Sequence, residues 1–156
     1  MKENPAMNKV YENMKPGVLS LHGFLGDDKR DIELIIDHDA AELESLGVTA
    51  VEIAAGLEKL RDKALEGLGD YISLEGGFSV KANSIRGKLP CPFGHKGLYR
   101  KNVVSLSGPG IDSVLMFTDL GIHLVREHGF FQGKGSPFRL EPAEIAGILK
   151  KLSGDV

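Results

Sequence analysis

The residues of this sequence best suited to metal chemistry lie in a short, stiff segment with prolines at both Pro90 and Pro92. Cys91, between them, offers a soft thiolate ligand, and His95 follows after three intervening residues. Two further histidines occur in a later segment with helical character. Zinc in proteins prefers four nitrogen and sulfur ligands, so the sequence predicts a metal site formed by Cys91, His95, His123 and His128. His22 is an alternative histidine ligand for the same site.

The spacing Cys-x3-His followed by His-x4-His resembles part of a C2H2 zinc finger, in which a hairpin cysteine pair meets histidines on a helix. Only one cysteine is present, and the match covers less than a third of the chain. On an ideal helix, with ~100° per residue, His123 and His128 point about 140° apart. Joint ligation therefore requires the helix to tighten or end at His128, and Gly129 is a suitable stop signal.

Two other interpretations use the same residues. In a cysteine-dependent enzyme, Cys91 would be the nucleophile, His95 or His123 its base, and Arg100 or Lys101 would lower the pKa of the thiol. In a metal-free domain, Cys91 would be a small apolar side chain and the histidines would be structural. The sequence contains no CxxC pair, nucleophile elbow, Walker motif or dinucleotide fingerprint, so whether the protein is an enzyme stays open.

Charge divides the chain into two unlike parts. Residues 27–76 contain 14 acidic and 5 basic side chains, whereas residues 77–139 contain 9 basic and 3 acidic ones. The two parts could simply complement each other, or the basic part could bind a phosphate or carboxylate through Arg100, Lys101, Lys134 and Arg139. The expected partners are accordingly an unidentified protein or a small anionic ligand.

Sequence-specific DNA binding is disfavoured. The segment around Gly47 has the spacing of a helix-turn-helix, but its second helix opens with Glu52 and has no basic residue before Lys59. The sequence pI of about 5.9 also argues against general nucleic-acid binding.

Asp39 is unusual because it falls on the apolar stripe of its predicted helix. A buried carboxylate needs a partner, so we expect an ion pair or hydrogen bond between Asp39 and the basic part of the chain. A ligand-binding role for this carboxylate is the alternative.

The elements that must position these residues form an α+β domain. Helical stripes and caps predict an N-terminal helix pair, the first from about Asp27 to Gly47 and the second from Thr49 to Gly69. Short β-branched runs predict a four-stranded antiparallel sheet made of two hairpins, which the Cys91 segment joins. Two C-terminal helices follow, one starting at Thr118 or Asp119 and one near Pro142. Residues 1–17 are expected to be a flexible tail and residues 18–156 a single domain.

Composition limits the class of protein further. No run approaches the ~20 apolar residues that cross a bilayer, so no membrane association is expected. A lone cysteine cannot form an intrachain disulfide, and a reduced thiol favours a cytoplasmic protein. The sequence thus predicts a small cytoplasmic binding module with one structural zinc site, the alternatives being a cysteine-dependent enzyme and a metal-free domain that binds a protein or anion through its basic face.

Overall fold

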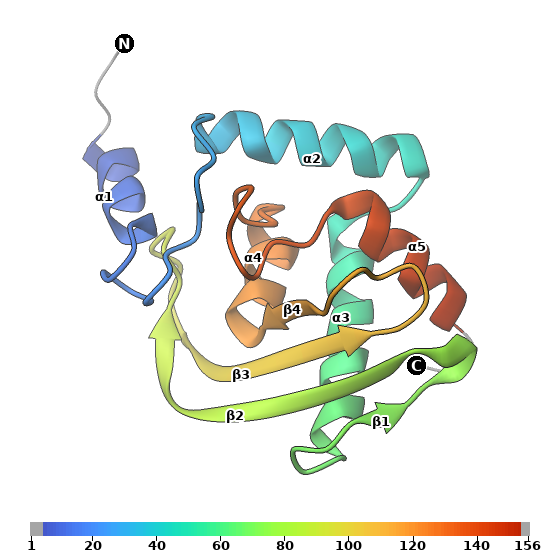
Figure 1. Cartoon of the computed structure of the whole chain (residues 1–156). Helices are drawn as coiled ribbons and strands as arrows, with labels where there is room; N and C mark the ends of the chain where they lie inside the picture. Colours follow the sequence, from blue (N-terminus) through green and yellow to red (C-terminus); the bar gives the residue numbers. More distant parts are fainter. Residues whose placement is uncertain (1–4, 154–156) are drawn as a thin grey trace.

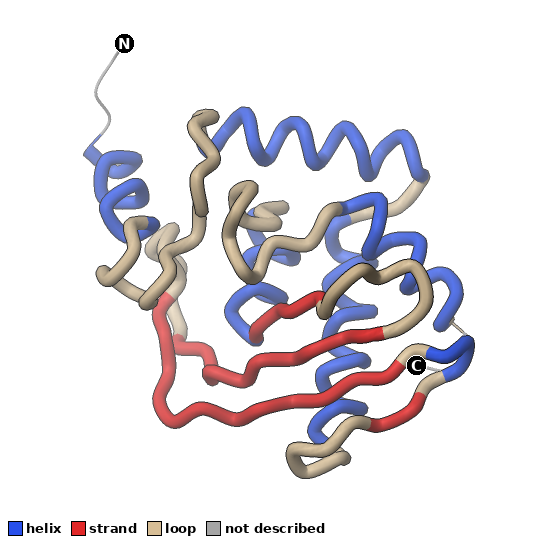
Figure 2. Tube along the Cα trace, in the orientation of Figure 1, coloured by secondary structure: helices blue, strands red, loops and turns tan. Residues whose placement is uncertain are grey.

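The computed structural model describes residues 5–153, and within that range it contains five α-helices and a four-stranded antiparallel sheet (Figures 1 and 2). The predicted α+β class is confirmed. The helices are α1 (Pro5–Met14), α2 (Ile32–Leu46), α3 (Ala50–Leu65), α4 (Asp119–His128) and α5 (Pro142–Leu152). The strands are β1 (Ile72–Ser73), β2 (Ser79–Pro90), β3 (Leu98–Ser107) and β4 (Leu115–Thr118), in the order β1-β2-β3-β4. None of the described helices is long and apolar enough to traverse a bilayer.

The strands form one continuous meander rather than two separate hairpins. The longest pairing is between β2 and β3, and its last pair is Pro90 opposite Leu98. The segment that carries Cys91 and His95 is therefore the turn of this long hairpin. β1 contributes only two residues, and a short 3-10 turn over Glu75–Gly77 connects it to β2.

A β-bulge changes the direction of the β2–β3 ribbon. Ile85 pairs with Lys101 and Lys88 pairs with Arg100, so two residues of β2, Arg86 and Gly87, have no partner in the ladder. Bulges bend the strand that contains them. The far end of the ribbon accordingly bends away from the sheet toward α1, as Figure 1 shows at the left of the molecule.

Local signals in the sequence define most helix ends. Gly47 adopts a left-handed conformation with φ of 72° and terminates α2, and Gly129 does the same for α4 with φ of 61°. Thr49 and Glu52 form the predicted capping box at the start of α3. Thr118 caps α4, because its hydroxyl accepts a hydrogen bond of 2.9 Å from the Gly121 amide. α2 begins at Ile32 rather than near Asp27, and α3 ends at Leu65 rather than at Gly69.

The N-terminal segment differs from the flexible tail expected over residues 1–17. Residues 5–14 form α1, and residues 1–4 lie outside the described part. Four apolar residues at helical spacing explain this helix, because they lie on one face and pack into an apolar cluster: Met7, Val10, Tyr11 and Met14. The Asn13 side chain also donates a hydrogen bond of 3.0 Å to the Pro92 carbonyl, which ties α1 to the β2–β3 turn.

Two apolar clusters hold the domain together. The larger cluster joins α3, α4 and α5 to the inner face of the sheet, with Leu57, Val104 and Ile145 fully buried. The smaller one joins α1, the first turn of α2, α4 and the β2–β3 turn, and it includes Cys91, Leu120 and Leu124. The turn of the long hairpin is thus part of a packed core.

Asp39 has the partner that its sequence position requires. Its carboxylate is fully buried and accepts two hydrogen bonds from the Arg139 guanidinium, at 2.9 and 3.0 Å. The expected ion pair between the acidic and basic parts of the chain is confirmed at this position.

Candidate metal centre

Four side chains from two elements converge at one point of the molecule. The β2–β3 turn supplies Cys91 and His95, and α4 supplies His123 and His128. The Cys91 Sγ lies 3.4 Å from His128 Nε2, and His95 Nδ1 lies 3.3 Å from His123 Nε2. The bend of the ribbon and the cap at Gly129 together produce this arrangement. The spatial juxtaposition expected from the sequence is therefore present.

Two of the separations between these atoms match edges of a zinc tetrahedron. With Zn–N bonds of ~2.0–2.1 Å and a Zn–S bond of ~2.3 Å, tetrahedral ligands stand about 3.3 Å apart for two nitrogens and about 3.6 Å for nitrogen and sulfur. The observed values are 3.3 and 3.4 Å. One ligand atom each from Cys91, His123 and His128 also lies within 4.8 Å of the other two. This donor set could hold one zinc ion.

His123 and His128 reach the same point although they are five residues apart. His128 is the last residue of α4, so no further turn constrains its side chain. Leu120 and Leu124 lie on the helix face between the two histidines, and Cys91 belongs to the same apolar cluster as these leucines. The thiol accordingly lies within 4.8 Å of a ring nitrogen of each histidine, and the two ring centroids are 5.4 Å apart. Because α4 ends at Gly129, His123 and His128 can approach each other although they are five residues apart.

Aromatic side chains orient two of the imidazoles. The Tyr99 hydroxyl lies 2.9 Å from His123 Nδ1, which leaves Nε2 of that ring directed toward His95. The Phe93 ring stacks on His128 with a centroid distance of 4.3 Å. A partner on the second ring nitrogen is the usual arrangement around metal-bound histidines, because it fixes the tautomer and the ring plane.

Burial keeps the two helix histidines neutral. Loss of solvation, reinforced by the charges of His128 and His95, lowers the pKa of His123 from 6.5 to about 4. Burial, and next the proximity of His95, also lowers the pKa of His128. Only a neutral imidazole can donate a lone pair to a metal, so both rings are in the ligating form near pH 7.

The four residues differ in exposure. Cys91 is 3% exposed and His123 is 7% exposed, whereas His128 is half-buried and His95 is exposed. His95 is therefore the outermost potential ligand, and it reaches the group through His123. The compact group found among the described residues consists of Cys91, His123 and His128, and His95 lies outside it, in contact with His123. His22, the alternative histidine, is exposed and is also outside this group.

A second group of ligand-type residues does not form a comparable site. His38, Asp39 and Glu42 lie close together on α2, but both carboxylate oxygens of Asp39 already accept hydrogen bonds from Arg139. The His38 side chain is 60% exposed. This group therefore consists of one member of the buried Asp39–Arg139 ion pair and its neighbours on α2.

The four residues predicted to bind an anion have different environments. Arg100 is exposed on β3, next to the half-buried Lys101, and Lys134 is exposed in the loop after α4. Arg139 is not available to an external anion, because its guanidinium is 4% exposed and pairs with Asp39 and Glu141. Burial opposes its charge, but hydrogen bonds to these carboxylates outweigh that effect and raise the pKa of Arg139. Arg139 is thus a core cation, which corrects the sequence prediction.

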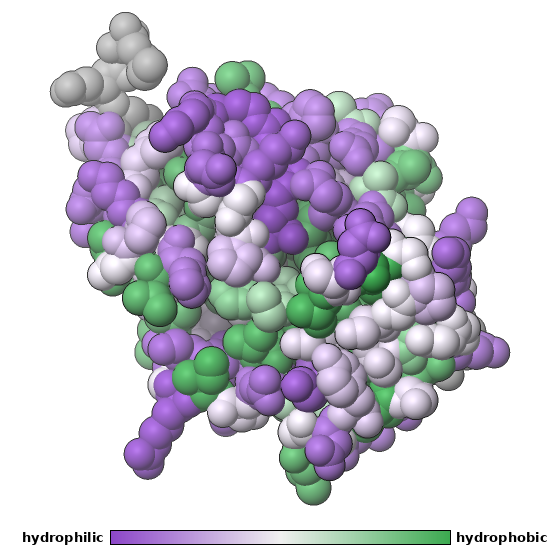
Figure 3. Space-filling model, in the orientation of Figure 1, coloured by the Kyte–Doolittle hydropathy of each residue, from purple (hydrophilic) through white to green (hydrophobic). Residues whose placement is uncertain are grey.

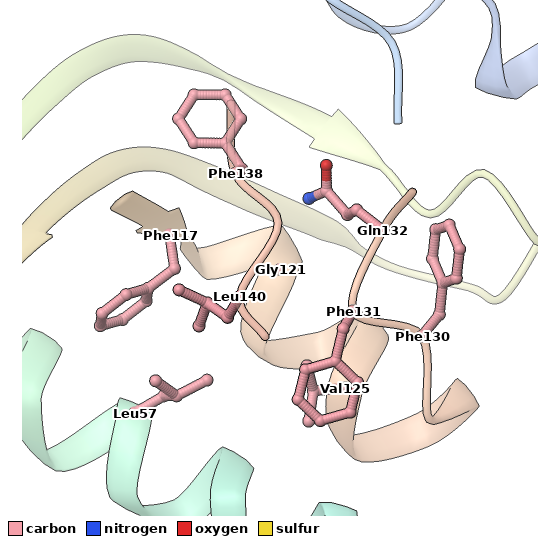
Figure 4. Close-up of a pocket in the computed structure, with 9 residues that line it drawn as sticks. All are labelled: Leu57, Phe117, Gly121, Val125, Phe130, Phe131, Gln132, Phe138 and Leu140. Carbon is pink, nitrogen blue, oxygen red and sulfur yellow. The ribbon is translucent and has the colours of Figure 1, made fainter. Parts of the chain in front are cut away.

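The small pocket beside α4 does not provide a ligand site (Figure 4). Aromatic and aliphatic side chains line it, and Figure 4 shows Phe117, Leu140 and Phe131 around the space between α3 and α4. Its volume of about 10 Å³ could hold at most one water molecule. The metal-ligand cluster is the better candidate for chemistry.

Sequence reasoning missed the contributions of Tyr99, Phe93 and α1 to this cluster. Phe93 lies within the proline-flanked segment and Tyr99 follows it closely, so their positions along the chain were a usable signal. The apolar stripe of α1 was another. Comparisons of the chain with protein-family models, curated proteins and solved structures found no match. The function of this chain is therefore inferred from its geometry alone.

Proposed function

We propose that this protein is a small cytoplasmic binding module in which Cys91, His95, His123 and His128 coordinate one structural zinc ion. The observation that carries the proposal is the pair of contacts at 3.3 and 3.4 Å, which equal the ligand separations around tetrahedral zinc within about 0.2 Å. A single cysteine without a disulfide partner supports a reducing compartment.

The ion would join two parts of the chain that are otherwise held by side-chain packing. It would fix the turn of the β2–β3 hairpin to α4, which carries His123 in its middle and His128 at its C-terminal end. Four protein ligands leave no open position for a substrate, which is typical of structural rather than catalytic zinc. The smaller apolar cluster would then fold together with metal binding.

Metal analysis of the purified protein tests this proposal directly. We expect about one zinc per chain after purification without added metal, and a lower melting temperature after chelation. Cys91→Ser and His128→Ala should both lose the metal. His22→Ala, which removes an exposed histidine outside the cluster, is the matched control and should retain it.

Cobalt substitution provides a readout that does not depend on stability. Cobalt bound to wild-type protein should show a sulfur-to-metal charge-transfer band, and the folded Cys91→Ser protein should lose that band. Metal-free wild-type protein that binds neither zinc nor cobalt would overturn the proposal, as would equal zinc retention in the Cys91→Ser and His22→Ala proteins.

A second candidate is a cysteine-dependent enzyme, which the 3.4 Å contact between the Cys91 thiol and His128 Nε2 favours. Two observations weigh against it. The thiol is 3% exposed, and the lowered pKa of His128 opposes formation of a thiolate–imidazolium pair. Rapid alkylation of Cys91 by iodoacetamide at neutral pH, in protein free of metal and still folded, would favour the enzyme.

A further inference from the structure

The β2–β3 ribbon is the basic surface of the molecule. The chain has no Asp or Glu between Gly76 and Ile111, but this stretch contains six cations: Lys81, Arg86, Lys88, Lys96, Arg100 and Lys101. Lys81 lies over the Tyr71 ring, with its Nζ 4.9 Å from the ring centroid. The other five form no ion pair with any residue in the range 5–153. Their charge is therefore not neutralised within the described structure.

Three of these cations border an open groove at the bulge, which we call the ribbon groove. It has a volume of about 450 Å³, within the ~300–1,000 Å³ typical of small-molecule sites. Its lining consists of Ser84, Ile85, Arg86, Gly87, Lys88, Arg100 and Asn102. Hydrophilic side chains reach outward at the same bend of the ribbon, at the lower left of Figure 3.

The strand register adds an independent indication of an anion. Lys88 and Arg100 are directly opposite each other in the ladder. Like charges in opposing positions destabilise a β-sheet, and both side chains are exposed with no acidic neighbour in their strands. A negatively charged ligand between them would remove this repulsion.

Neutral polar and apolar side chains beside the cations indicate which kind of anion would fit the groove. The Ser84 hydroxyl donates a hydrogen bond of 2.8 Å to the Asn102 side-chain carbonyl, so neutral hydrogen-bonding groups line the same wall. Ile85 is 52% exposed and offers an apolar contact beside the charges. Two arginines and a lysine suit phosphate oxygens, because guanidinium groups bind them through paired N–H donors.

We propose that the ribbon groove binds the phosphate group of a small phosphate ester, through Arg86, Lys88 and Arg100. A long nucleic acid is a poorer fit, because α2 carries four acidic residues besides the buried Asp39 and no lysine or arginine, and it would repel an extended polyanion. The ester's organic part would lie against Ile85. This proposal uses no residue of the candidate metal centre.

Titration of uniformly labelled protein with adenosine monophosphate, followed by amide chemical shifts, tests the proposal. We expect saturable shifts confined to residues 84–88 and 100–102, with a dissociation constant of about 1 mM or tighter. The affinity should fall as salt is added, because solvent-exposed charges are screened. Inorganic phosphate should shift the same amides more weakly, since it lacks the contact with Ile85.

Variants separate a binding role from a structural one. Lys88→Gln removes one of two facing like charges, so it should fold at least as stably as the wild type while binding adenosine monophosphate at least tenfold more weakly. Lys59→Gln, an exposed lysine change on α3, is the matched control and should bind normally. Equal losses in both variants, or no saturable shifts in the groove, would overturn the proposal. A single-stranded oligonucleotide binding far more tightly than the monophosphate would also overturn it, in favour of nucleic acid.

Discussion

Replacement of Arg139 by methionine should destabilise the domain more than any single change at an exposed ion pair. Arg139 donates hydrogen bonds to both oxygens of Asp39, and its guanidinium also contacts the Gln132 carbonyl at 2.7 Å and Glu141 at 2.8 Å. The methionine side chain would fill similar space but leave the Asp39 carboxylate fully buried with no guanidinium partner. Removal of one member of a buried ion pair costs about 3–5 kcal/mol of unfolding free energy.

The reverse change should cost less. In the Asp39→Leu protein, Arg139 keeps Glu141 and the Gln132 carbonyl as partners. We therefore expect a loss of about 1–3 kcal/mol. The double variant, Asp39→Leu with Arg139→Met, buries no unpaired carboxylate and should be more stable than Arg139→Met alone.

Urea denaturation followed by circular dichroism measures these free energies, and an unchanged m-value would show that the comparison is valid. Arg126→Met is the matched control, since its partner Glu58 lies 3.0 Å away but both side chains are partly exposed. It should cost about 0–1 kcal/mol. If Arg139→Met costs no more than Arg126→Met, or if the double variant is the least stable protein, the buried pair does not stabilise the domain.

Three further predictions concern the candidate metal centre and the loop packing. In metal-free protein, His123 has a pKa of about 4 in the folded state and 6.5 in the unfolded state, so the unfolded chain binds more protons as the pH falls below 6.5. The free energy of unfolding should therefore fall by about 2 kcal/mol from pH 7 to pH 5. Urea titrations of the His123→Asn protein should show a smaller loss. Tyr99→Phe removes the hydroxyl beside His123 and should weaken zinc binding ~10–100-fold in competition with a chromogenic chelator; an unchanged affinity would contradict the orienting role. Gly26→Ala would place a methyl group 2.4 Å from the backbone of the loop that contains Gly135, so it should lower the melting temperature more than Gly110→Ala, which has a similar positive φ but open space around it.

The sequence was most informative where a local signal decides the structure. Glycine at the ends of two helices, the capping box at Thr49 and the cap at Thr118 all define element boundaries through hydrogen bonds or backbone angles within a few residues. The metal-ligand cluster could be anticipated because a hairpin and a following helix must return to the same region, whatever the detailed register.

Other features depend on contacts that no local pattern specifies. The continuous meander and the two unpaired residues at Arg86 and Gly87 result from tertiary packing of a long ribbon. The position of Arg139 was also misjudged, because its neighbours in sequence suggest an exposed loop, whereas its partner Asp39 is a hundred residues away. α1 was overlooked since ten residues seldom form a stable helix alone, and its apolar stripe is stabilised only by the turn it covers.

The irregularity in β2 skips two residues of the strand rather than one. Because consecutive side chains alternate between the two faces, a step of two preserves the inward and outward phase on both sides of the irregularity. Loss of Arg86 and Gly87 together would thus leave every remaining strand residue on its present face while removing the irregularity that bends the ribbon.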